Sequence, residues 1–420
     1  MNMQVKETVN NIAIKAKIAL KSLRKISSNQ KNDALKFSAE SIIKNLGKIL
    51  IANQEDIKFA NQKGIKKSLL KRLELDEGKI RNISKSLNDV ADLEDPVGKI
   101  IDSRYRPNGL TVKKISVPIG VIGIIYESRP NVTSDAASLC LKSGNACILR
   151  CGSESFNSSK AILESLYFGL NKAKISLDSI QMIPTRSRDA VSELLKLNNS
   201  VDIIIPRGGK NLIEKINNGT KIPVISHLDG NCHTYIHKDA DIQKSIDLII
   251  NAKFRNISIC GATESLLIDS SILLTHLPKI IENLISNGCK IYGDDNCVSV
   301  DKRIHNASED DWYTEYLDSK ISVKSVKDIN QAITHIQKYG SGHTDCIITE
   351  NKVAASKFFN EIDSAIVMHN TSTQFADGGE FGLGSEIGIS TNRLHARGPV
   401  GLEELTTYKW LVESDGQVRK

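Results

Sequence analysis

The sequence predicts an α/β protein built from two doubly wound parallel-sheet domains, and two patterns indicate this fold. From Gly120 onward, short runs rich in Val and Ile alternate with stretches that carry apolar residues at helical spacing. At Gly230 a second series of the same alternation begins. A chain of 420 residues is long enough for two domains of ordinary size.

The composition is that of a globular protein with a hydrophobic core, because 40% of the residues are hydrophobic and 25% are charged. The formal net charge of +7 is spread along the chain, which argues against nucleic-acid binding and fits small anionic substrates. Charges interrupt residues 1–25, and the longest uncharged apolar run, 115–126, is too short to span a bilayer. We therefore expect a cytoplasmic protein with no membrane partner and mostly reduced cysteines.

The elements of the first domain follow from hydrophobic periodicity. Residues 1–95 have a helical pattern, residues 110–117 alternate as a half-exposed strand does, and the run 120–126 suits a strand buried on both faces. Further strands are expected at 146–149, 180–183, 201–205 and 223–225, and helices at 153–170, at 188–197 and from about 209.

The second series shows the same alternation. Strands are expected at 234–236, 266–268, 321–323, 345–349 and 365–368, and helices at 241–254, 272–285 and 329–336. The section 375–391 is dense in glycine, which indicates a functional loop or a tightly packed connection. Residues 402–412 fit an extended arm.

Cys260 is the strongest candidate for chemistry. It lies between a helical pattern and the strand-like run 265–268, so its thiol can face a cleft and act as a nucleophile if neighbours lower its pKa. Cys232 is a rival because His233 follows it, although adjacent side chains on a strand point to opposite faces. None of the eight cysteines has the spacing of metal ligands, so no metal site is expected.

Two further segments are candidates for ligand binding. Asn131 follows the buried strand and precedes a helix, so it is either a helix N-cap or an amide donor to an oxyanion. The run Pro206-Arg207-Gly208-Gly209 follows a strand and opens a helix, where backbone N–H groups can hold a pyrophosphate. An ordinary strand-to-helix turn also uses glycine, and the chain has neither G-x-G-x-x-G nor a P-loop motif.

Taken together, seven segments resemble the gamma-glutamyl phosphate reductases, a branch of the aldehyde dehydrogenase superfamily. They are the runs 120–132, 144–145, 205–209, 230–233, 341–345, 375–384 and 395–399. The resemblance covers nearly the whole chain from about residue 10, and the motifs near its end are specific to this branch.

The resemblance implies an aldehyde dehydrogenase-like fold with an oligomerisation arm. It assigns residues 1–229 to an NADP-binding domain, with 100–118 contributing to the arm, residues 230–390 to a catalytic domain and 391–420 to a C-terminal arm. It also implies a homo-oligomer, either a dimer or a tetramer, and functional coupling to glutamate 5-kinase.

The implied reaction is the NADPH-dependent reduction of L-glutamyl 5-phosphate to L-glutamate 5-semialdehyde and phosphate, the second step of proline synthesis from glutamate. Cys260 would attack the acyl phosphate and expel phosphate, leaving a thioester. Asn131 and the backbone N–H of Cys260 would hold the oxyanion. Hydride from NADPH would then give a thiohemiacetal that collapses to the aldehyde.

The resemblance also implies contacts with the cofactor. Arg150 aligns with a lysine that contacts the adenosine ribose, and Ser153 stands where NAD-preferring members often carry a glutamate, which favours NADPH. If Glu154 is the matching residue instead, this argument reverses. Glu315 would hold the nicotinamide ribose.

Two departures from the superfamily concern the reaction. In place of the E-L-G-G motif with its general-base glutamate, this chain reads Ser226-His227-Leu228-Asp229-Gly230, which fits a reaction that needs no hydrolytic water. A proline and an asparagine beside the nucleophile are replaced by Ser258 and Gly261. His395 and Arg397, in the branch-specific tail, are candidates for substrate binding or for an ordered turn.

Three other functions remain open at the level of sequence. They are a related dehydrogenase for another aldehyde or an acyl-CoA, a hydrolase that uses Cys232 and His233, and a basic binding protein without catalysis. Binding of NADPH would separate the dehydrogenases from the other two.

Overall fold

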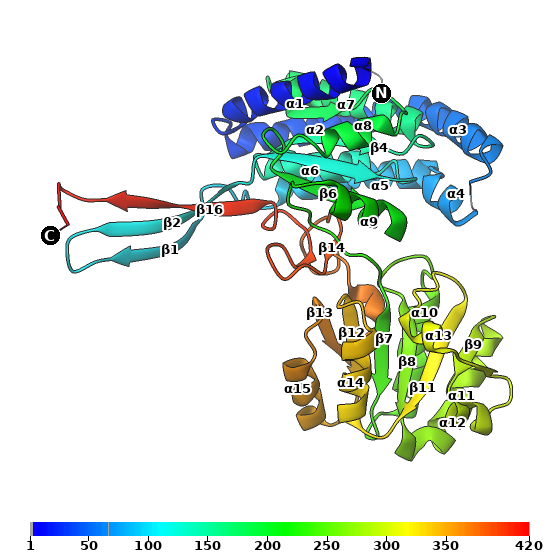
Figure 1. Cartoon of the computed structure of the whole chain (residues 1–420). Coiled ribbons are helices and arrows are strands. Elements are labelled where there is room, and N and C mark those ends of the chain that lie inside the picture. The colour runs from blue at the N-terminus through cyan, green and yellow to red at the C-terminus, as the bar shows by residue number, and fades with distance from the viewer. Residues whose placement is uncertain (1–2, 66, 420) are drawn as a thin grey trace. The chain divides into compact units, whose positions relative to one another are not determined.

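The computed structural model describes residues 3–65 and 67–419, and the chain forms two compact units (Figure 1). The first unit comprises Met1–Ser226, Gly382–Gly388 and Val400–Lys420. The second unit comprises His227–Phe381 and Ile389–Pro399. No helix among the described residues is both long enough and apolar enough to cross a membrane.

The N-terminal part of the first unit is helical, as the sequence predicts. Its helices are α1 (Met3–Leu23), α2 (Ser28–Lys44), α3 (Leu46–Gln62), α4 (Lys67–Leu73) and α5 (Glu77–Asp92). Side-chain caps fix where two of them begin: Ser27 accepts a hydrogen bond from the Gln30 N–H, and Asp76 accepts one from the Lys79 N–H. Helix α2 packs against α5 and α7, so these helices are part of the unit and not a separate extension.

A four-stranded parallel sheet forms the centre of the first unit. Its strands are β3 (Val121–Tyr126), β4 (Ala146–Cys151), β5 (Ile180–Met182) and β6 (Ile203–Arg207), in the order β5-β4-β3-β6. The connecting helices are α6 (Val132–Lys142), α7 (Phe156–Lys172) and α8 (Asp189–Leu194), and α9 (Lys210–Gly219) follows β6. Because crossovers between parallel strands are right-handed, the reversal of direction after β5 puts α8 on the face opposite α6 and α7.

Two expectations for this unit are wrong in detail. The helix expected from residue 153 begins at Phe156, because the preceding residues form a turn in which the Glu154 carboxylate accepts hydrogen bonds from the N–H and hydroxyl of Ser128. The strand expected at 223–225 is reduced to one bridge between Val224 and Ile204. Pro223 has no N–H to donate to a ladder, which limits pairing there.

The second unit contains a seven-stranded sheet in which every neighbouring pair is parallel. The strands are β7 (Cys232–Ile236), β8 (Thr263–Asp269), β9 (Lys290–Gly293), β10 (His305–Asn306), β11 (Lys320–Val326), β12 (Thr344–Ile348) and β13 (Ile366–His369). Their order is β10-β9-β11-β8-β7-β12-β13. The parallel sheets of both units confirm the predicted α/β fold class.

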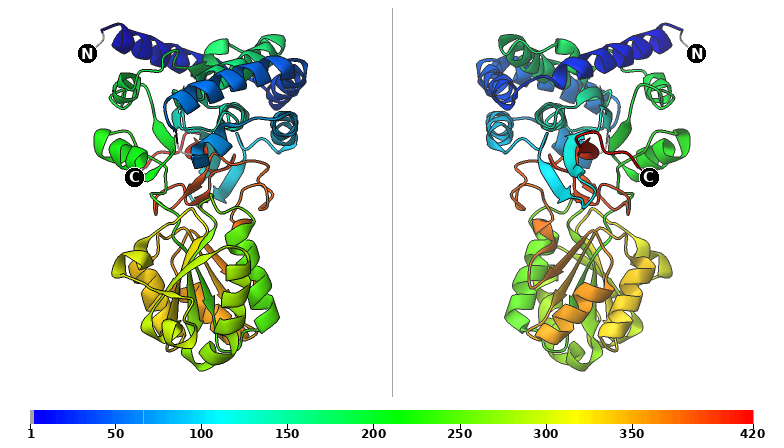
Figure 2. Two further views of the ribbon diagram at one scale, coloured as in Figure 1. Left: turned by 90° about the vertical axis from the view of Figure 1, so that its right-hand side faces the viewer. Right: turned by 90° about the vertical axis from the view of Figure 1, so that its left-hand side faces the viewer.

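Helices cover both faces of this sheet (Figure 2). They are α10 (Ile242–Phe254), α11 (Leu273–Ser286), α12 (Asp295–Val300), α13 (Glu309–Tyr313), α14 (Ile329–Tyr339) and α15 (Lys352–Glu361). Residues of α10, α11 and α12 form one hydrophobic cluster with the sheet, and residues of α14 and α15 form another. The strands are therefore buried on both sides, which accounts for their Val- and Ile-rich sequences.

The rest of the first unit includes an antiparallel arm. Strands β1 (Ile100–Tyr105), β2 (Thr111–Pro118) and β16 (Thr406–Glu413) pair in the order β1-β2-β16, so the arm joins two segments far apart in sequence.

In the glycine-dense section 375–391, a Cβ at Gly388 would lie 2.5 Å from Nη1 of Arg207. At this glycine the backbone is tightly packed, whereas a Cβ at Gly382 would meet nothing within 4 Å. The short strands β14 (Ile389–Ser390) and β15 (Gly398–Pro399) pair in the second unit.

One fully buried ion pair ties helix α10 to the sheet of the second unit. The Lys253 ammonium lies 2.5 Å from Oε2 of Glu264, and both side chains are inaccessible to solvent. The other carboxylate oxygen, Oε1, accepts the backbone N–H of Leu317 at 3.1 Å. Burial raises the pKa of Glu264 to about 7, against the opposing effect of Lys253. The pair thus connects α10, β8 and the loop before β11.

We expect Glu264→Gln to lower the free energy of unfolding by about 3–5 kcal/mol, because it leaves the Lys253 ammonium buried without a charged partner. Replacing both residues, as Lys253→Met with Glu264→Leu, should restore most of that loss. Urea unfolding followed by circular dichroism measures both effects. The exposed pair of Lys244 and Glu350 provides the control, since Glu350→Gln should cost less than about 1 kcal/mol. If the Glu264→Gln chain is as stable as the wild type, Glu264 and Lys253 do not form a buried ion pair.

Candidate active site

Four segments of the second unit meet at the amino edge of its sheet. Cys260 precedes β8, His227 and Gly230 precede β7, Glu315 precedes β11 and His343 precedes β12. These four strands are neighbours in the order β11-β8-β7-β12 and are mutually parallel, so their amino ends lie at one edge. The sheet therefore brings together side chains that are far apart in sequence.

The loop that carries Cys260 runs from the end of α10 to the start of β8, as predicted. It packs so closely on Gly230 that a Cβ there would lie 2.7 Å from the Cα of Cys260. At Ser258, the backbone N–H and the hydroxyl both donate to Oδ1 of Asn256. A Cβ at Gly261 would lie 3.1 Å from the Thr373 carbonyl, so this glycine, a departure from the superfamily pattern, sits in a crowded position.

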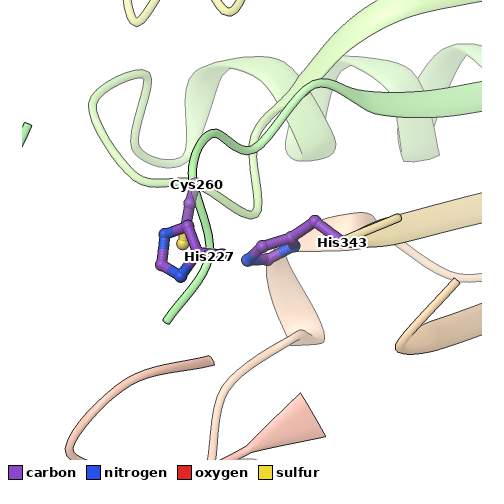
Figure 3. A group of neighbouring side chains, drawn as sticks. All are labelled: His227, Cys260 and His343. Carbon is purple, nitrogen blue, oxygen red and sulfur yellow. The ribbon is translucent and has the colours of Figure 1, made fainter. Parts of the chain in front are cut away.

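Two histidines flank the thiol of Cys260, as Figure 3 shows. The Cys260 Sγ and one ring nitrogen each of His227 and His343 lie within 4.8 Å of one another. The two imidazole rings make an edge-to-face contact with centroids 5.1 Å apart. Nδ1 of His227 lies 2.6 Å from the Ile389 carbonyl, which can only accept a hydrogen bond. The neutral ring of His227 therefore carries its lone pair on Nε2.

The surroundings of Cys260 favour its thiolate. Burial by itself would raise the pKa of the thiol, but the charges of His343 and His227 and their hydrogen bonds hold this pKa well below its usual value. Cys260 is also partly exposed as a residue, whereas the other seven cysteines are buried. These are the properties expected of a nucleophilic cysteine.

The rival thiol, Cys232, has the opposite properties. It is fully buried, and its Sγ donates to the Cys260 carbonyl at 3.0 Å. Burial, followed by the charge of Asp345, raises the pKa of Cys232 well above its usual value. The adjacent His233 does not activate it, because Nδ1 of His233 lies 3.2 Å from Oδ1 of Asp345. The structure favours Cys260.

Glu315 lies at the same edge, in the loop between α13 and β11. Its carboxylate accepts the backbone N–H of Gly230, while burial and then the charge of Cys260 raise its pKa. Gly230 thus contacts both the nucleophile and this carboxylate, which explains why a residue without a side chain occupies that position.

Asn131 lies at the first turn of α6 in the first unit, after strand β3. It occupies the N-cap position of this helix, but its side chain makes no capping hydrogen bond. Instead, Nδ2 of Asn131 donates to Oδ2 of Asp135 at 2.8 Å. Burial raises the pKa of Asp135 to about 6, against the hydrogen bond from Asn131 and the charge of Arg207. One N–H of the amide is bound to Asp135, and the second remains as the donor suited to an oxyanion.

The residues after β4 show which of two neighbouring side chains is accessible. Glu154 is buried and bound to Ser128, whereas Ser153 is partly exposed. Arg150 is buried, and its Nη2 donates to the carbonyls of Arg186 and Ser187 at 3.3 and 3.1 Å. The accessible group of this turn is therefore a hydroxyl and not a carboxylate.

The run Pro206–Gly209 lies where the sequence predicts, at the end of β6 and before α9. The Gly209 N–H at the start of α9 donates to Oε2 of Glu127 at 3.1 Å. A Cβ at Gly208 would lie 2.5 Å from the same oxygen. The Arg207 side chain points elsewhere, toward Gly388. Burial raises the pKa of Glu127, which shows that its charge is poorly solvated there.

The two tail residues do not form a cluster. Nη1 of Arg397 donates to the Asp363 carboxylate at 2.7 Å, and Arg393 pairs with the same carboxylate. His395 is exposed. The ion pairs on Asp363 fit an ordered turn, the simpler of the two interpretations.

Sequence reasoning assigned no role to His227 or His343. His343 lies inside the segment 341–345 that carries the resemblance, whereas His227 lies in the run 226–230, which departs from the E-L-G-G motif of the superfamily. A histidine directly before a predicted parallel strand was the available signal, because the amino ends of such strands share one edge.

Comparison with known proteins identifies the family. Residues 2–290 match the model of the aldehyde dehydrogenase family. The chain is 48% identical to the gamma-glutamyl phosphate reductase of Parvibaculum lavamentivorans over 98% of this chain and 97% of that protein. It is 49% identical to the enzyme of the same name from Rhodospirillum rubrum, over 97% and 96% of the two chains.

Solved structures agree with these relatives. The crystal structure of the gamma-glutamyl phosphate reductase of Thermotoga maritima is 43% identical, with a TM-score of 0.95 over 98% of this chain and all of that one. An acetylating aldehyde dehydrogenase from Geobacillus thermoglucosidasius, 20% identical with a TM-score of 0.73, covers 100% of this chain and 99% of its own and shares the fold. The chain therefore belongs to the aldehyde dehydrogenase family, in the branch of the gamma-glutamyl phosphate reductases, and is an oxidoreductase.

Proposed function

We propose that the chain reduces L-glutamyl 5-phosphate to L-glutamate 5-semialdehyde with NADPH, through a thioester on Cys260. The observation that carries the proposal is the thiol of Cys260 flanked by His227 and His343, with its pKa held low. The substrate follows from the name of relatives that are 48–49% identical over nearly the full chain. The product would serve proline synthesis, after a glutamate 5-kinase that supplies the acyl phosphate.

In the first step, the Cys260 thiolate attacks the acyl carbon. A C–S bond forms, the bond to the phosphate oxygen breaks, and phosphate leaves with the electron pair. The imidazolium beside the thiolate gives its proton to the departing phosphate. No water has to be activated, which fits the run 226–230 in place of the E-L-G-G motif with its glutamate base.

In the second half of the reaction, the nicotinamide, when bound, supplies a hydride to the thioester carbonyl. Asn131 and the backbone N–H of Cys260 would donate hydrogen bonds to the oxyanion. The oxyanion then reforms the carbonyl as the C–S bond breaks, so this collapse needs no proton transfer, and the imidazole that protonated the phosphate regains its proton from solvent before the next turnover. The sulfur leaves as a thiolate, and the histidines stabilise its charge.

The side chains of the first unit fit a dinucleotide with a 2′-phosphate. Arg150 and Ser153 lie after β4, and the Pro206–Gly209 turn precedes the N-terminus of α9, where N–H groups attract a phosphate. The buried, hydrogen-bonded Glu154 leaves Ser153 as the accessible group, which supports NADPH over NADH.

In the second unit, Glu315 would hold the nicotinamide ribose. For His395 and Arg397 a role in substrate binding is the weaker proposal, given the pairing of Arg397 with Asp363.

The low pKa of Cys260 has a measurable consequence. Because the pKa of Cys260 is held well below that of an ordinary thiol, the rate of alkylation by iodoacetamide should reach its plateau at a clearly lower pH than the rate for an ordinary cysteine. In His343→Gln the pKa should return toward about 8.5, so the rate at pH 7 should drop by about tenfold or more.

Mass spectrometry of the alkylated peptide and the reductase assay complete this test. Cys260→Ala should abolish turnover with glutamyl phosphate, and also the reverse reaction of the semialdehyde with NADP and phosphate. Cys289→Ser, at a cysteine with a raised pKa, is the matched control and should remain active. Retained turnover in Cys260→Ala would overturn the mechanism, and turnover that requires coenzyme A instead of phosphate would favour the related acyl-CoA reductases.

The Glu127 carboxylate, which accepts the Gly209 N–H at the start of α9, leads to a prediction about cofactor binding. If the phosphates of NADPH bind at the Gly209 N–H, the negative charge of Glu127 opposes them. Glu127→Gln should therefore lower the Kd for NADPH by about threefold to tenfold, measured by fluorescence titration. Glu214→Gln, an exposed change further along α9, should leave the Kd unchanged. Weaker binding by Glu127→Gln would show that the phosphates bind elsewhere.

We also propose that the arm of the first unit mediates a homo-oligomer. Tyr408, Trp410 and Val412 alternate along β16 and expose about half of each side chain, and the Lys114 ammonium lies 3.7 Å from the Tyr408 ring centroid. An exposed apolar row on a three-stranded sheet is typical of an interface. Trp410→Glu should shift the sedimentation coefficient toward that of a monomer. Lys409→Glu, on the other face of β16, should not; an unchanged assembly in Trp410→Glu would contradict the proposal.

A further inference from the structure

The three side chains around the nucleophile also have the composition of a metal site. The Cys260 Sγ and one ring nitrogen each of His227 and His343 lie within 4.8 Å of one another (Figure 3). Among the residues that the structure describes, 3–65 and 67–419, this is the group of three His, Cys, Asp or Glu side chains whose ligand atoms lie close enough together to hold a metal ion. They come from three separate loops, before β8, β7 and β12, so only the folded second unit brings them together.

The donor atoms select a particular class of cation. One thiolate and two imidazoles suit zinc and the softer cadmium, whereas magnesium and calcium prefer oxygen ligands. Three protein ligands would leave the fourth position of a tetrahedral ion open to water or an anion.

Neighbouring groups already orient both imidazoles as in known zinc sites. Nδ1 of His227 donates to the Ile389 carbonyl, and Nδ1 of His343 lies 2.9 Å from the Thr344 hydroxyl. In metal sites, the non-ligating nitrogen of a histidine makes this kind of hydrogen bond, which fixes the ring and the tautomer. His343 is fully buried, and one of its ring nitrogens belongs to the group around the Cys260 sulfur.

The geometry requires only a small adjustment. Around a tetrahedral zinc ion, neighbouring S and N ligand atoms are about 3.4–3.6 Å apart, given the usual metal–ligand distances. Because the three ligand atoms lie within 4.8 Å of one another, the distances between them must shorten by about 1 Å at most to fit such an ion. Cys260 and His227 are partly exposed and lie in loops, so rotation of their side chains can provide it.

We propose that His227, Cys260 and His343 form an inhibitory site for a thiophilic divalent cation of the zinc or cadmium type. A bound ion would use the sulfur lone pair needed to attack the acyl phosphate and the nitrogens needed to move its proton. Binding releases any proton on the thiol and involves no oxidation, so a chelator reverses it. Inhibition rests on the proposed function, but binding of the ion does not.

Titration of the full chain with cadmium tests the binding directly. The ultraviolet charge-transfer absorbance of a cadmium–thiolate bond should rise to an end point of one ion per chain. It should be lost in Cys260→Ser, and His343→Gln should weaken binding by about 100-fold or more. Cys289→Ser and His305→Gln, which change a cysteine and a histidine outside the group, should bind as the wild type does. Absence of the band, or its survival in Cys260→Ser, would overturn the proposal.

Zinc then tests the consequence for reactivity. Stoichiometric zinc should protect Cys260 from iodoacetamide, suppress reductase turnover by about tenfold or more, and lose both effects on addition of EDTA. Alkylation of Cys260 at an unchanged rate with zinc present would overturn the proposal. The absorbance and alkylation readouts need no substrate, so they decide the metal site even if turnover with glutamyl phosphate fails and overturns the proposed function.

Discussion

The parallel register of the seven-stranded sheet is the constraint on which the candidate site depends. Strands β11, β8, β7 and β12 are neighbours, and each is preceded by a loop that carries one part of the site. Had one of these strands been antiparallel, its loop would lie at the opposite edge. Because parallel strands require crossover connections, long helical segments separate Cys260, Glu315 and His343 in sequence although they are close in space. The cost of this arrangement is a set of loops that must each be fixed independently.

Buried contacts fix those loops. The carboxylate of Glu264, on β8, binds the Lys253 ammonium at the end of α10 and the N–H of Leu317, two residues after Glu315. Gly230 fixes the other side, because it lies against the backbone of Cys260 and donates its N–H to Glu315. The same few contacts therefore anchor both the loop of Cys260 and the loop of Glu315.

The sequence predicted the fold class, the position of nearly every central strand and the loop of Cys260, because these depend on local hydrophobic periodicity. It could not separate Cys260 from Cys232, because the two thiols differ in their tertiary surroundings: Cys232 is fully buried with a raised pKa, whereas the pKa of Cys260 is lowered. Nor could it show that Glu127 accepts the N–H of Gly209, in the turn where a phosphate was expected to bind. Local pattern specifies elements, whereas pKa values and hydrogen-bond partners depend on tertiary contacts.

The candidate residues of the two units lie at opposite edges of their sheets, and this bears on the charges around Cys260. In the first unit the candidate residues follow strands β3, β4 and β6, at the edge where helix N-termini attract phosphates. In the second unit the site lies at the amino edge, where α10 and α14 end. The C-terminus of a helix carries partial negative charge, which disfavours a thiolate. Burial disfavours it too, so the low pKa of Cys260 requires local positive charge, and His343 and His227 supply it. A helix N-terminus, which lowers the pKa of cysteines in other folds, is not the source of activation here.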